Sequence, residues 1–305
     1  MGRRRQKGRP IDGWVNIDKP AGMTSAHAVA KVKRLLDAAK AGHGGTLDPL
    51  ATGVLPIALG AATKLLPFVV DRPKTYCFTI RWGESRDTDD AEGAVTATSA
   101  KRPSLAEIDA ALPGFTGVIE QVPPAYSAIK LDGQRAYDLA RAGAAVELAA
   151  RPVEVFEFKR LDGVDGGELT AFEVRCGKGT YIRALARDLA RQLGTCGYIA
   201  QLSRTQVGGF RLEDAISLES WAELGHKAPR DEYVAPMATA LDDIPAVAVT
   251  AEEARRLMAG GTIRHLGLDD GLLALQWDGR LLAIANVEAG DVQPIRVFNQ
   301  RQMRA

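Results

Sequence analysis

The chain has 305 residues and a formal net charge of +1, with 46% apolar and 25% charged residues. That length exceeds one small module and fits one large and one small domain, and the composition is that of a globular protein, unlike a disordered chain. No apolar run reaches the roughly 18 residues of a membrane span, and none behind the N-terminus fits a secretory signal.

The first nine residues carry five basic side chains and no acidic one. Residues 246–305 carry seven of each sign, which leaves a net charge of −4 on residues 10–245. We expect residues 1–9 to form a disordered basic tail. Such a tail can contact nucleic-acid phosphates, or it can simply be solvated and aid solubility.

In chain order, Thr24 or Ser25 is placed to cap a first helix. Its apolar residues recur with a spacing that puts them on one face: Val29, Val32, Leu35 and Leu36. A glycine-rich segment, GHGGTLDPLATG, spans residues 42–53. Its glycines are expected to strip the loop of side chains, so that a ligand can approach the backbone. Residues 76–82 alternate as a strand does.

An acidic segment at 87–93, DTDDAEG, is interpreted as a solvated hairpin turn. Two strands are predicted at 153–161 and 169–176, followed by a helix over 181–193. One face of that helix is apolar, with Ile182, Leu185, Leu189 and Leu193. Arginines recur every four residues on another face: Arg183, Arg187 and Arg191.

Prolines around 236 and 245 indicate a connection between domains. The last sixty residues predict a small, mostly β module, with a helix at 252–258 and strands at 272–277 and 281–287. Asp278-Gly279 between those strands is a strong hairpin signal.

The common cofactor and metal motifs are absent from the sequence. The glycine-rich segment has Leu47 where a dinucleotide-binding loop has its third glycine, and no GxxxxGK[ST] is present. Four scattered histidines form no HExxH pattern. The sequence has three cysteines that lie far apart, Cys77, Cys176 and Cys196, and this pattern suggests neither disulfides nor a thiolate metal site. It is typical of a protein of a reducing compartment. We therefore expect no cofactor and no metal.

Asp48, Arg183 and two tyrosines remain as candidates for chemistry. Pro49 restricts Asp48 to an extended conformation, so Asp48 should lie in a loop, where an aspartate can act as nucleophile or base, although Asp-Pro is also an ordinary turn. Arg183 in the first turn of its helix opposes the helix dipole, so it either holds an anion or belongs to a solvated arginine stripe. Tyr76 and Tyr181 can stack on bases or pack in a core.

Seven segments occur in a characteristic order. They are GWVNIDKPAGMTS (13–25), GHGGTLDPLATGVLPIALGAATK (42–64), KTY (74–76), DTDDAEG (87–93), PPAYSAIKLDGQRAYDLARAG (123–143), GTYIRALARDL (179–189) and LSRTQVGGF (202–210). Together they resemble the TruB family of bacterial tRNA pseudouridine synthases, which modify uridine 55 in the T-arm. The match covers nearly all of residues 11–215. Gly44 departs from it, since many members have Thr there, which affects only the expected loop geometry.

The resemblance implies an α+β fold with a mixed, mainly antiparallel sheet over residues 10–245. It further implies a PUA-like RNA-binding β module over 246–305. Asp48 would be the essential catalytic carboxylate, Arg183 its ion-pair partner, and Tyr76 the ring that stacks on the target base. The implied substrate-binding and supporting positions are His43, filling the space of the flipped nucleotide, Tyr181 and Leu202, lining the uracil pocket, and Lys19 and Pro20, buttressing it.

The implied reaction breaks the N1–C1′ bond of uridine, turns the uracil and rejoins it through C5. It needs no redox change or external group, which agrees with the missing cofactor motifs. The implied partner is the T-arm of tRNA, and we expect a cytoplasmic monomer with no membrane association and no protein partner. Two alternatives stay open at this point: a non-catalytic tRNA-binding protein on the same scaffold, and a metal-dependent hydrolase using Asp87, Asp89, Asp90 and Glu92.

Overall fold

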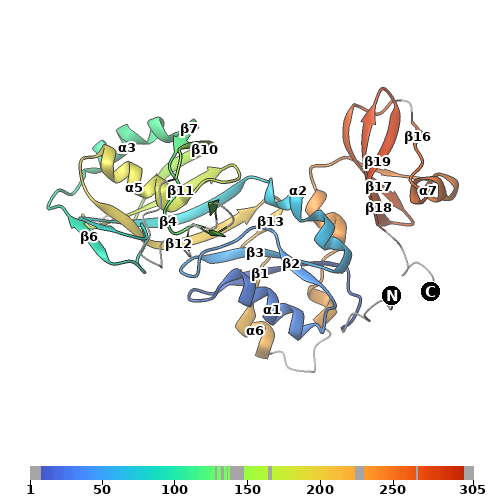
Figure 1. The fold of residues 1–305 in the computed structure, drawn as a ribbon, viewed down its shortest axis with the longest axis horizontal. Coiled ribbons are helices and arrows are strands. Elements are labelled where there is room, and N and C mark those ends of the chain that lie inside the picture. Colours follow the sequence, from blue (N-terminus) through green and yellow to red (C-terminus); the bar gives the residue numbers. More distant parts are fainter. Residues whose placement is uncertain are drawn as a thin grey trace.

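Two sheets of different size form the protein (Figure 1). The computed structural model describes residues 8–127, 129–131, 134–135, 137, 148–163, 167–223, 230–265 and 267–298. Residues 1–7 of the expected tail and most of the 123–143 segment from residue 128 onward lie outside the described residues. Within the described part of the chain, no helix has both the length and the apolar character that a membrane crossing requires.

The large sheet is built mostly from long antiparallel neighbours. From one edge to the other its strands are β14 (Ile216–Ser217), β1 (Gly13–Lys19), β3 (Thr52–Leu59), β12 (Gly197–Val207), β4 (Lys74–Trp82), β11 (Leu169–Cys176), β10 (Arg151–Leu161) and β7 (Gly117–Gln121). Two short strands join at its side, β2 (Ala41–His43) on β3 and β13 (Phe210–Arg211) on β12. The β1–β14 and β3–β12 pairs are parallel and the other pairs antiparallel. The sheet is therefore mixed and mainly antiparallel, as predicted.

Helices pack on both faces of this sheet: the helices that carry Val32, Ile108, Leu185 and Trp221 lie on one face, and the helix that carries Val69 packs with Trp14 and Val54 on the other. Their bounds are α1 (Ser25–Leu35), α2 (Leu66–Val70), α3 (Leu105–Ala111), α5 (Ile182–Gln192) and α6 (Leu218–Glu223), with 3-10 turns η1 (Gly60–Leu65), η2 (Leu112–Phe115), η3 (Arg230–Tyr233) and η4 (Met237–Leu241). Thr24 caps α1 by accepting the backbone N–H of His27 at 3.2 Å, as predicted. Helix α5 agrees with its prediction to within one residue at each end, and its apolar stripe is buried.

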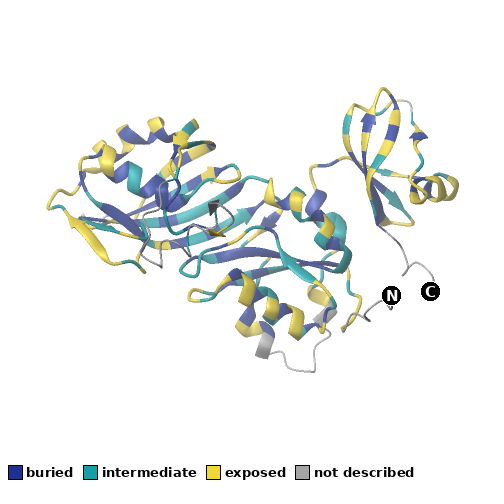
Figure 2. Ribbon diagram, viewed as in Figure 1, coloured by how far each residue is buried: buried dark blue, intermediate teal, exposed yellow. Residues whose placement is uncertain are grey.

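Alternation along the strands decides which side chains enter the core. Phe78 and Ile80 of β4 are buried with Phe172 of β11 and the apolar face of α5, so this face of the sheet is closed by helices (Figure 2). Thr75 and Cys77 alternate with them and belong to the opposite face. The catalytic candidate Tyr76 shares the face of Phe78, which places it on the helix-covered side.

The second sheet begins at Ala246. Its strands, in order, are β15 (Ala246–Ala248), β17 (Gly271–Trp277), β18 (Arg280–Glu288), β19 (Asp291–Val297) and β16 (Ile263–Arg264), and α7 (Ala251–Met258) packs on it. Asp278 (φ 52°) and Gly279 (φ 69°) both have positive φ, which is the geometry of a type I′ turn. The hairpin predicted from the Asp-Gly pair is confirmed.

The proline-containing stretch before this sheet belongs structurally to the large sheet. Trp14 pairs with Ala235 through two backbone hydrogen bonds, and its indole N–H donates to the carbonyl of Met237 at 3.1 Å. The stretch between Pro236 and Pro245, predicted to connect the domains, therefore begins at the large sheet. Apolar residues of β17 and β18, including Ala274 and Ile284, pack with Val54 of β3 in one cluster, which joins the two sheets.

The remaining short strands form two hairpins. They are β5 (Glu84–Arg86) with β6 (Val95–Thr98), and β8 (Lys130–Leu131) with β9 (Gln134–Arg135). The tip of the first hairpin is the acidic segment 87–93. That segment contacts the large sheet, because the backbone N–H of Ile199 in β12 donates to the backbone carbonyl of Asp89 at 3.1 Å.

Candidate active site

A loop between β2 and β3 presents Asp48. The loop follows His43 and ends at Thr52, and the Asp48 carbonyl accepts the N–H of Ala51 at 3.1 Å. The predicted loop position of Asp48 is confirmed. Its side chain is 38% exposed, so the carboxylate is open to a ligand while one oxygen is held by the protein.

Arg183 holds that oxygen. Its Nη2 lies 2.9 Å from Oδ2 of Asp48, and the Arg183 side chain is only 5% exposed. Nη2 also donates to the carbonyl of Tyr126 at 2.8 Å, and Nη1 donates to the carbonyl of Thr88 at 2.9 Å and lies 3.4 Å from Oδ2 of Asp90. The interpretation as a solvated stripe is wrong for Arg183. The same planar fork serves two carboxylates and two carbonyls, which fixes where it points.

The acidic segment 87–93 forms the turn of the β5–β6 hairpin, as predicted, and part of it is buried beside this site. Asp90 is 3% exposed and accepts the Thr88 hydroxyl at 2.6 Å and the Glu92 N–H at 3.0 Å. Asp89 pairs with Arg187 at 3.0 Å. The carboxylates of Asp89 and Asp90 are thus committed to arginines and to local donors, while Asp87 and Glu92 are exposed. The prediction of a solvated segment is therefore wrong for Asp89 and Asp90 only.

The metal-hydrolase alternative finds no support in this arrangement. It named Asp87, Asp89, Asp90 and Glu92 as ligands, yet no group of His, Cys, Asp and Glu among the described residues is arranged to hold a metal ion. Asp87 instead accepts the N–H of Ala94 at 2.9 Å.

Three buried side chains hold the backbone of the Asp48 loop. The ammonium of Lys19 donates to the carbonyls of Pro20 (2.8 Å), Met23 (2.7 Å) and Pro49 (3.2 Å). The Ser25 hydroxyl donates to the Leu47 carbonyl at 3.0 Å and accepts the Leu47 N–H at 2.8 Å. The loop is therefore anchored on both sides of Asp48.

Arg204 completes this anchoring from β12. It is 1% exposed, and its guanidinium donates to the carbonyls of Gly45 at 3.0 Å, Thr46 at 3.5 Å and Val54 at 2.8 Å. Because five donors in a rigid plane satisfy several carbonyls at once, one arginine fixes the first half of the loop and the start of β3.

Burial shapes the acid–base behaviour of the anchoring groups. It lowers the pKa of Lys19 from 10.5 to about 8, although Asp48 and Glu92 act in the opposite direction. Burial also lowers the pKa of His43, and Arg204 lowers it further, which favours a neutral imidazole. Burial raises the pKa of Tyr76, so its hydroxyl is protonated at neutral pH.

The remaining predicted positions surround this loop to different extents. Tyr76 is half-buried on β4 and directly opposite Arg204 on β12, and Leu202 is 7% exposed on β12 opposite Phe78. Both belong to the cluster on the helix-covered face. His43 ends β2 next to the loop, with its Nδ1 buried and without a hydrogen-bond partner in the described structure.

Tyr181 is the residue that caps α5. Its backbone N–H donates to Gln121 at 2.8 Å and its carbonyl accepts from the same amide at 3.1 Å, so one buried glutamine fixes the start of the helix that carries Arg183. The guanidinium of Arg151 lies 5.2 Å from the Tyr181 ring centroid. Pro20 is half-buried and accepts from Lys19, consistent with a supporting position.

The glycines of the loop serve the protein's own packing. A Cβ on Gly53 (φ 99°) would lie 2.2 Å from the Arg204 carbonyl, and one on Gly44 would lie 2.7 Å from the Val69 side chain. The expectation that Gly42, Gly44, Gly45 and Gly53 make room for a ligand is therefore wrong for Gly44 and Gly53. Gly53 lets β3 approach β12, and Gly44 lets the loop approach α2.

Sequence reasoning missed the residues that hold the site together. Arg204 stood within a quoted segment without a role, and Ser25 was considered only as a helix cap. Gln121 and Asp90 were not recognised as partners of Tyr181 and Arg183. The one signal in the sequence for Arg204 is its place in a strand whose neighbouring residues are buried. A buried arginine in such a strand requires several acceptors.

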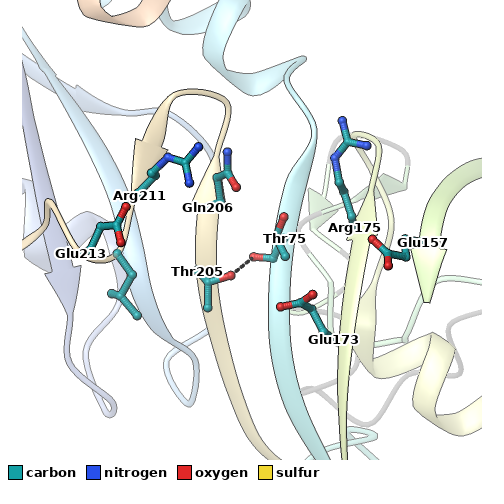
Figure 3. Close-up of a pocket in the computed structure, with 9 residues that line it drawn as sticks. Thr75, Glu157, Glu173, Arg175, Thr205, Gln206, Arg211 and Glu213 are labelled. Atoms are coloured by element: carbon teal, nitrogen blue, oxygen red, sulfur yellow. Dashed lines mark hydrogen bonds between the residues drawn. The ribbon is translucent and has the colours of Figure 1, made fainter. Parts of the chain in front are cut away.

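A surface groove lies on the face of the sheet opposite the candidate active site. It is a polar groove of about 340 Å³ (Figure 3). Its lining residues are Thr75, Glu157, Glu173, Arg175, Thr205, Gln206, Arg211, Leu212 and Glu213. Thr75 and Tyr76 point to opposite faces of β4, so this groove is separated from Asp48 by the sheet.

Comparison with known proteins matches one family model, described as the TruB family pseudouridylate synthase (N terminal domain), to residues 33–182. The tRNA pseudouridine synthase B of Bradyrhizobium diazoefficiens is 54% identical over 304 residues, covering 97% of this chain and 88% of that protein. The tRNA pseudouridine synthase B of Caulobacter vibrioides is 49% identical over 306 residues, covering 97% and 98%.

Solved structures extend the similarity to both sheets. A chain of a Cbf5–Nop10–Gar1 complex is 25% identical with a TM-score of 0.73, covering 95% of this chain and 86% of that one. A chain of an H/ACA RNP bound to a substrate RNA containing 2′-deoxyuridine is 25% identical with a TM-score of 0.71, covering 98% and 92%. The expected fold, a pseudouridine synthase domain with a C-terminal PUA-like module, is confirmed.

Proposed function

The chain belongs to the TruB family of pseudouridylate synthases, and from this premise we propose that it converts uridine 55 of the tRNA T-arm to pseudouridine. Relatives about half identical over nearly the full length are tRNA pseudouridine synthases B. The observation that carries the proposal is the ion pair of a buried Arg183 with a partly exposed Asp48. A protein that only bound RNA would have no need to orient one carboxylate so closely.

The catalytic role is assigned to Asp48. The reaction breaks N1–C1′ and forms C5–C1′, so atoms balance within the nucleotide and the proton at C5 is lost as N1 gains one. The carboxylate can act as nucleophile on the ribose or the base, or as base toward a ribose proton. Each role requires an ionised oxygen at a fixed place, and the Arg183 contact at 2.9 Å supplies the position.

Tyr76 is assigned to hold the uracil while it turns. Its ring lies on the helix-covered face, and stacking on a base contributes ~1–3 kcal/mol. Its protonated hydroxyl, whose pKa burial raises, is available as a hydrogen-bond donor. Tyr181 and Leu202 are assigned to line the uracil pocket, and His43 to fill the space of the flipped nucleotide. Lys19 and Pro20 support the loop.

The target nucleotide must leave its stack before it reaches Asp48. Extraction costs a few kcal/mol, and it is easier from a loop than from a continuous duplex. We divide the labour between a catalytic unit, residues 10–245, and an RNA-binding unit, residues 246–305, that supports affinity. We propose a cytoplasmic enzyme that acts as a monomer, since every residue assigned to the reaction lies on one chain.

The test separates an enzyme from a binding protein. Pseudouridine is mapped in T-arm RNA after incubation with the protein and with Asp48→Asn, and equilibrium binding of the same RNA is measured at one salt concentration. We expect conversion at position 55 by the parent, none by Asp48→Asn, and similar affinity for both. Conversion by a correctly folded Asp48→Asn protein would falsify the assignment of Asp48. Absence of conversion by the parent, with binding retained, would favour the binding-protein alternative.

A further inference from the structure

Arg204 is a buried cation to which the proposed reaction gives no role. It is 1% exposed, and its guanidinium donates to the backbone carbonyls of Gly45, Thr46 and Val54. Among the described residues, no carboxylate lies within ion-pair distance of it. Buried charges are usually paired, and departures from such rules concentrate at functional sites. We therefore looked for a function in what this guanidinium holds together.

The backbone of Arg204 lies between the two segments that carry the proposed catalytic groups. On β12 it is directly opposite Tyr76 of β4 on one side and Gly53 of β3 on the other. Gly53 is near the start of β3, which the Asp48 loop enters. A Cβ on Gly53 would lie 2.2 Å from the Arg204 carbonyl, so these two strands are in close contact. Residues directly opposite each other extend from the same face of a sheet, so Arg204 and Tyr76 share the face of the site.

The side chain of Arg204 spans the loop that carries Asp48. Nη2 donates to Gly45 at 3.0 Å and Nη1 to Thr46 at 3.5 Å, both before Asp48 in the chain. Nε donates at 2.8 Å to the carbonyl of Val54, which follows the loop. Because the guanidinium is planar and rigid, these contacts fix both ends of the loop relative to β12 and its neighbour β4.

The charge of Arg204 acts on titratable groups around the loop. Burial raises the pKa of Tyr76, and the charge and a side-chain hydrogen bond of Arg204 act against this rise. Burial lowers the pKa of His43, and Arg204 lowers it further. Within the described part of the chain, Arg204 is the one charged side chain that shifts the pKa of His43. The His43 pKa therefore reports where the guanidinium lies, whether or not RNA is bound.

We propose that Arg204 is a positioning residue of the reaction, which holds Asp48 and Tyr76 at the separation that the flipped uridine requires. The loop supplies the carboxylate and β4 supplies the ring, and Arg204 contacts both segments. The inference rests on the proposed function, since it takes Asp48 and Tyr76 to act on the uridine. Misplacing a catalytic group by about 1 Å can cost about 10²-fold in rate. Because Arg204 is buried, its loss should lower the rate and leave RNA affinity unchanged.

The experiment compares two variants of Arg204 with a matched control. Arg204→Lys keeps the charge and loses the planar fork, and Arg204→Met removes both. The control is Lys74→Met, which removes another buried cation from the strand of Tyr76. The ammonium of Lys74 donates to the carbonyls of Val70 and Arg72, which lie outside the Asp48 loop. The control therefore tests whether the loss of any buried cation in this region has the same effect.

Each protein is measured for single-turnover conversion of saturating T-arm RNA, equilibrium binding of that RNA, the His43 pKa by NMR titration, and the fold by circular dichroism. We expect both Arg204 variants to convert RNA roughly 10- to 100-fold more slowly than the parent, with affinity within about threefold of it. The pKa of His43 should rise in Arg204→Met and rise less in Arg204→Lys, which keeps a positive charge. Lys74→Met should keep the parent rate and the parent His43 pKa.

A folded Arg204→Met protein with the parent rate, or with the parent His43 pKa, overturns the positioning role and leaves the proposed function standing. An equal loss of rate in Lys74→Met, or a loss of rate matched by a loss of affinity, also overturns it. If neither Arg204 variant folds, Arg204 is a requirement of the fold and the positioning role is rejected. A parent protein that fails to convert the RNA rejects the proposed function itself, whatever the variants do.

Discussion

Replacing Arg183 by lysine should slow catalysis without removing a charge. Nη1 serves Thr88 and Asp90 while Nη2 serves Tyr126 and Asp48, so the two sides of the fork depend on different nitrogens. One lysine nitrogen cannot reach both sides. A hydrogen bond to a charged group contributes about 1.5–3 kcal/mol. If the hydrogen bond to Asp48 is lost and the stabilisation of the transition state decreases by about 2–3 kcal/mol, kcat should fall roughly 30- to 150-fold.

The same helix provides the control. Arg191→Lys changes the same residue type two turns later, where the side chain is 71% exposed and its contact with Asp188 is 3.7 Å long. Single-turnover conversion at saturating T-arm RNA gives the rate, equilibrium binding of that RNA gives the affinity, and circular dichroism confirms the fold. We expect Arg191→Lys to match the parent. If Arg183→Lys, correctly folded, stayed within about threefold of the parent rate, the fork would not position Asp48 and the reasoning would be refuted.

Four further outcomes are expected. Tyr76→Phe should convert T-arm RNA faster than Tyr76→Ala, because the ring supplies ~1–3 kcal/mol of stacking; equal, complete inactivity would assign the role to the hydroxyl. Gly53→Ala should lower the unfolding midpoint in urea far more than Gly22→Ala, since a Cβ meets backbone 2.2 Å away at Gly53 and nothing within 4 Å at Gly22, although both have positive φ. The pKa of Lys19 is about 8 in the folded protein and 10.5 in the unfolded chain, so between these values the unfolded chain binds more protons. The contribution of Lys19 to the free energy of unfolding therefore rises with pH across this window and is lost as pH falls through 8. Urea denaturation from pH 7 to 10 should show a weaker rise in Lys19→Met than in the parent. Removing residues 246–305 should weaken tRNA binding while single-turnover conversion survives, and complete loss in a folded truncation would contradict the division of labour.

Local patterns predicted the secondary structure of this chain well. The helix over 181–193 followed from an apolar stripe, and the hairpin at 278–279 from an Asp-Gly pair. Such signals depend on neighbours in sequence, which is why periodicity and turn chemistry sufficed. The path of the chain before the second sheet depends instead on a contact between residues that are distant in sequence. Trp14 forms two backbone hydrogen bonds with Ala235, more than two hundred residues away, and no local sequence pattern predicts that contact.

The environment of the candidate site could not be derived in that way. From its place in α5, Arg183 could equally have been solvated or bound to an anion. Only the folded chain brings Asp48 and Asp90 to it from two separate segments. The acidic segment looked solvated because its sequence does not show Arg187 and Arg183 opposite. Resemblance to a family supplied the Asp48–Arg183 pairing, but not the anchoring by Arg204.

The anchoring bears on Gly44, the position at which the sequence is expected to depart from the family pattern. Lys19, Ser25 and Arg204 donate hydrogen bonds to backbone carbonyls of the loop, so this part of the anchoring does not depend on the side chains of the loop. Leu47 and Ala51 add to it by burying their side chains in the core. Gly44 itself is fixed through its N–H, which donates to Pro56 at 2.8 Å. The space that a side chain would need there is occupied by Val69, whose Cγ1 would lie 2.7 Å from an added Cβ. Thr at position 44 therefore requires a smaller or displaced residue at position 69. At this position the loop and α2 therefore constrain each other through Gly44 and Val69.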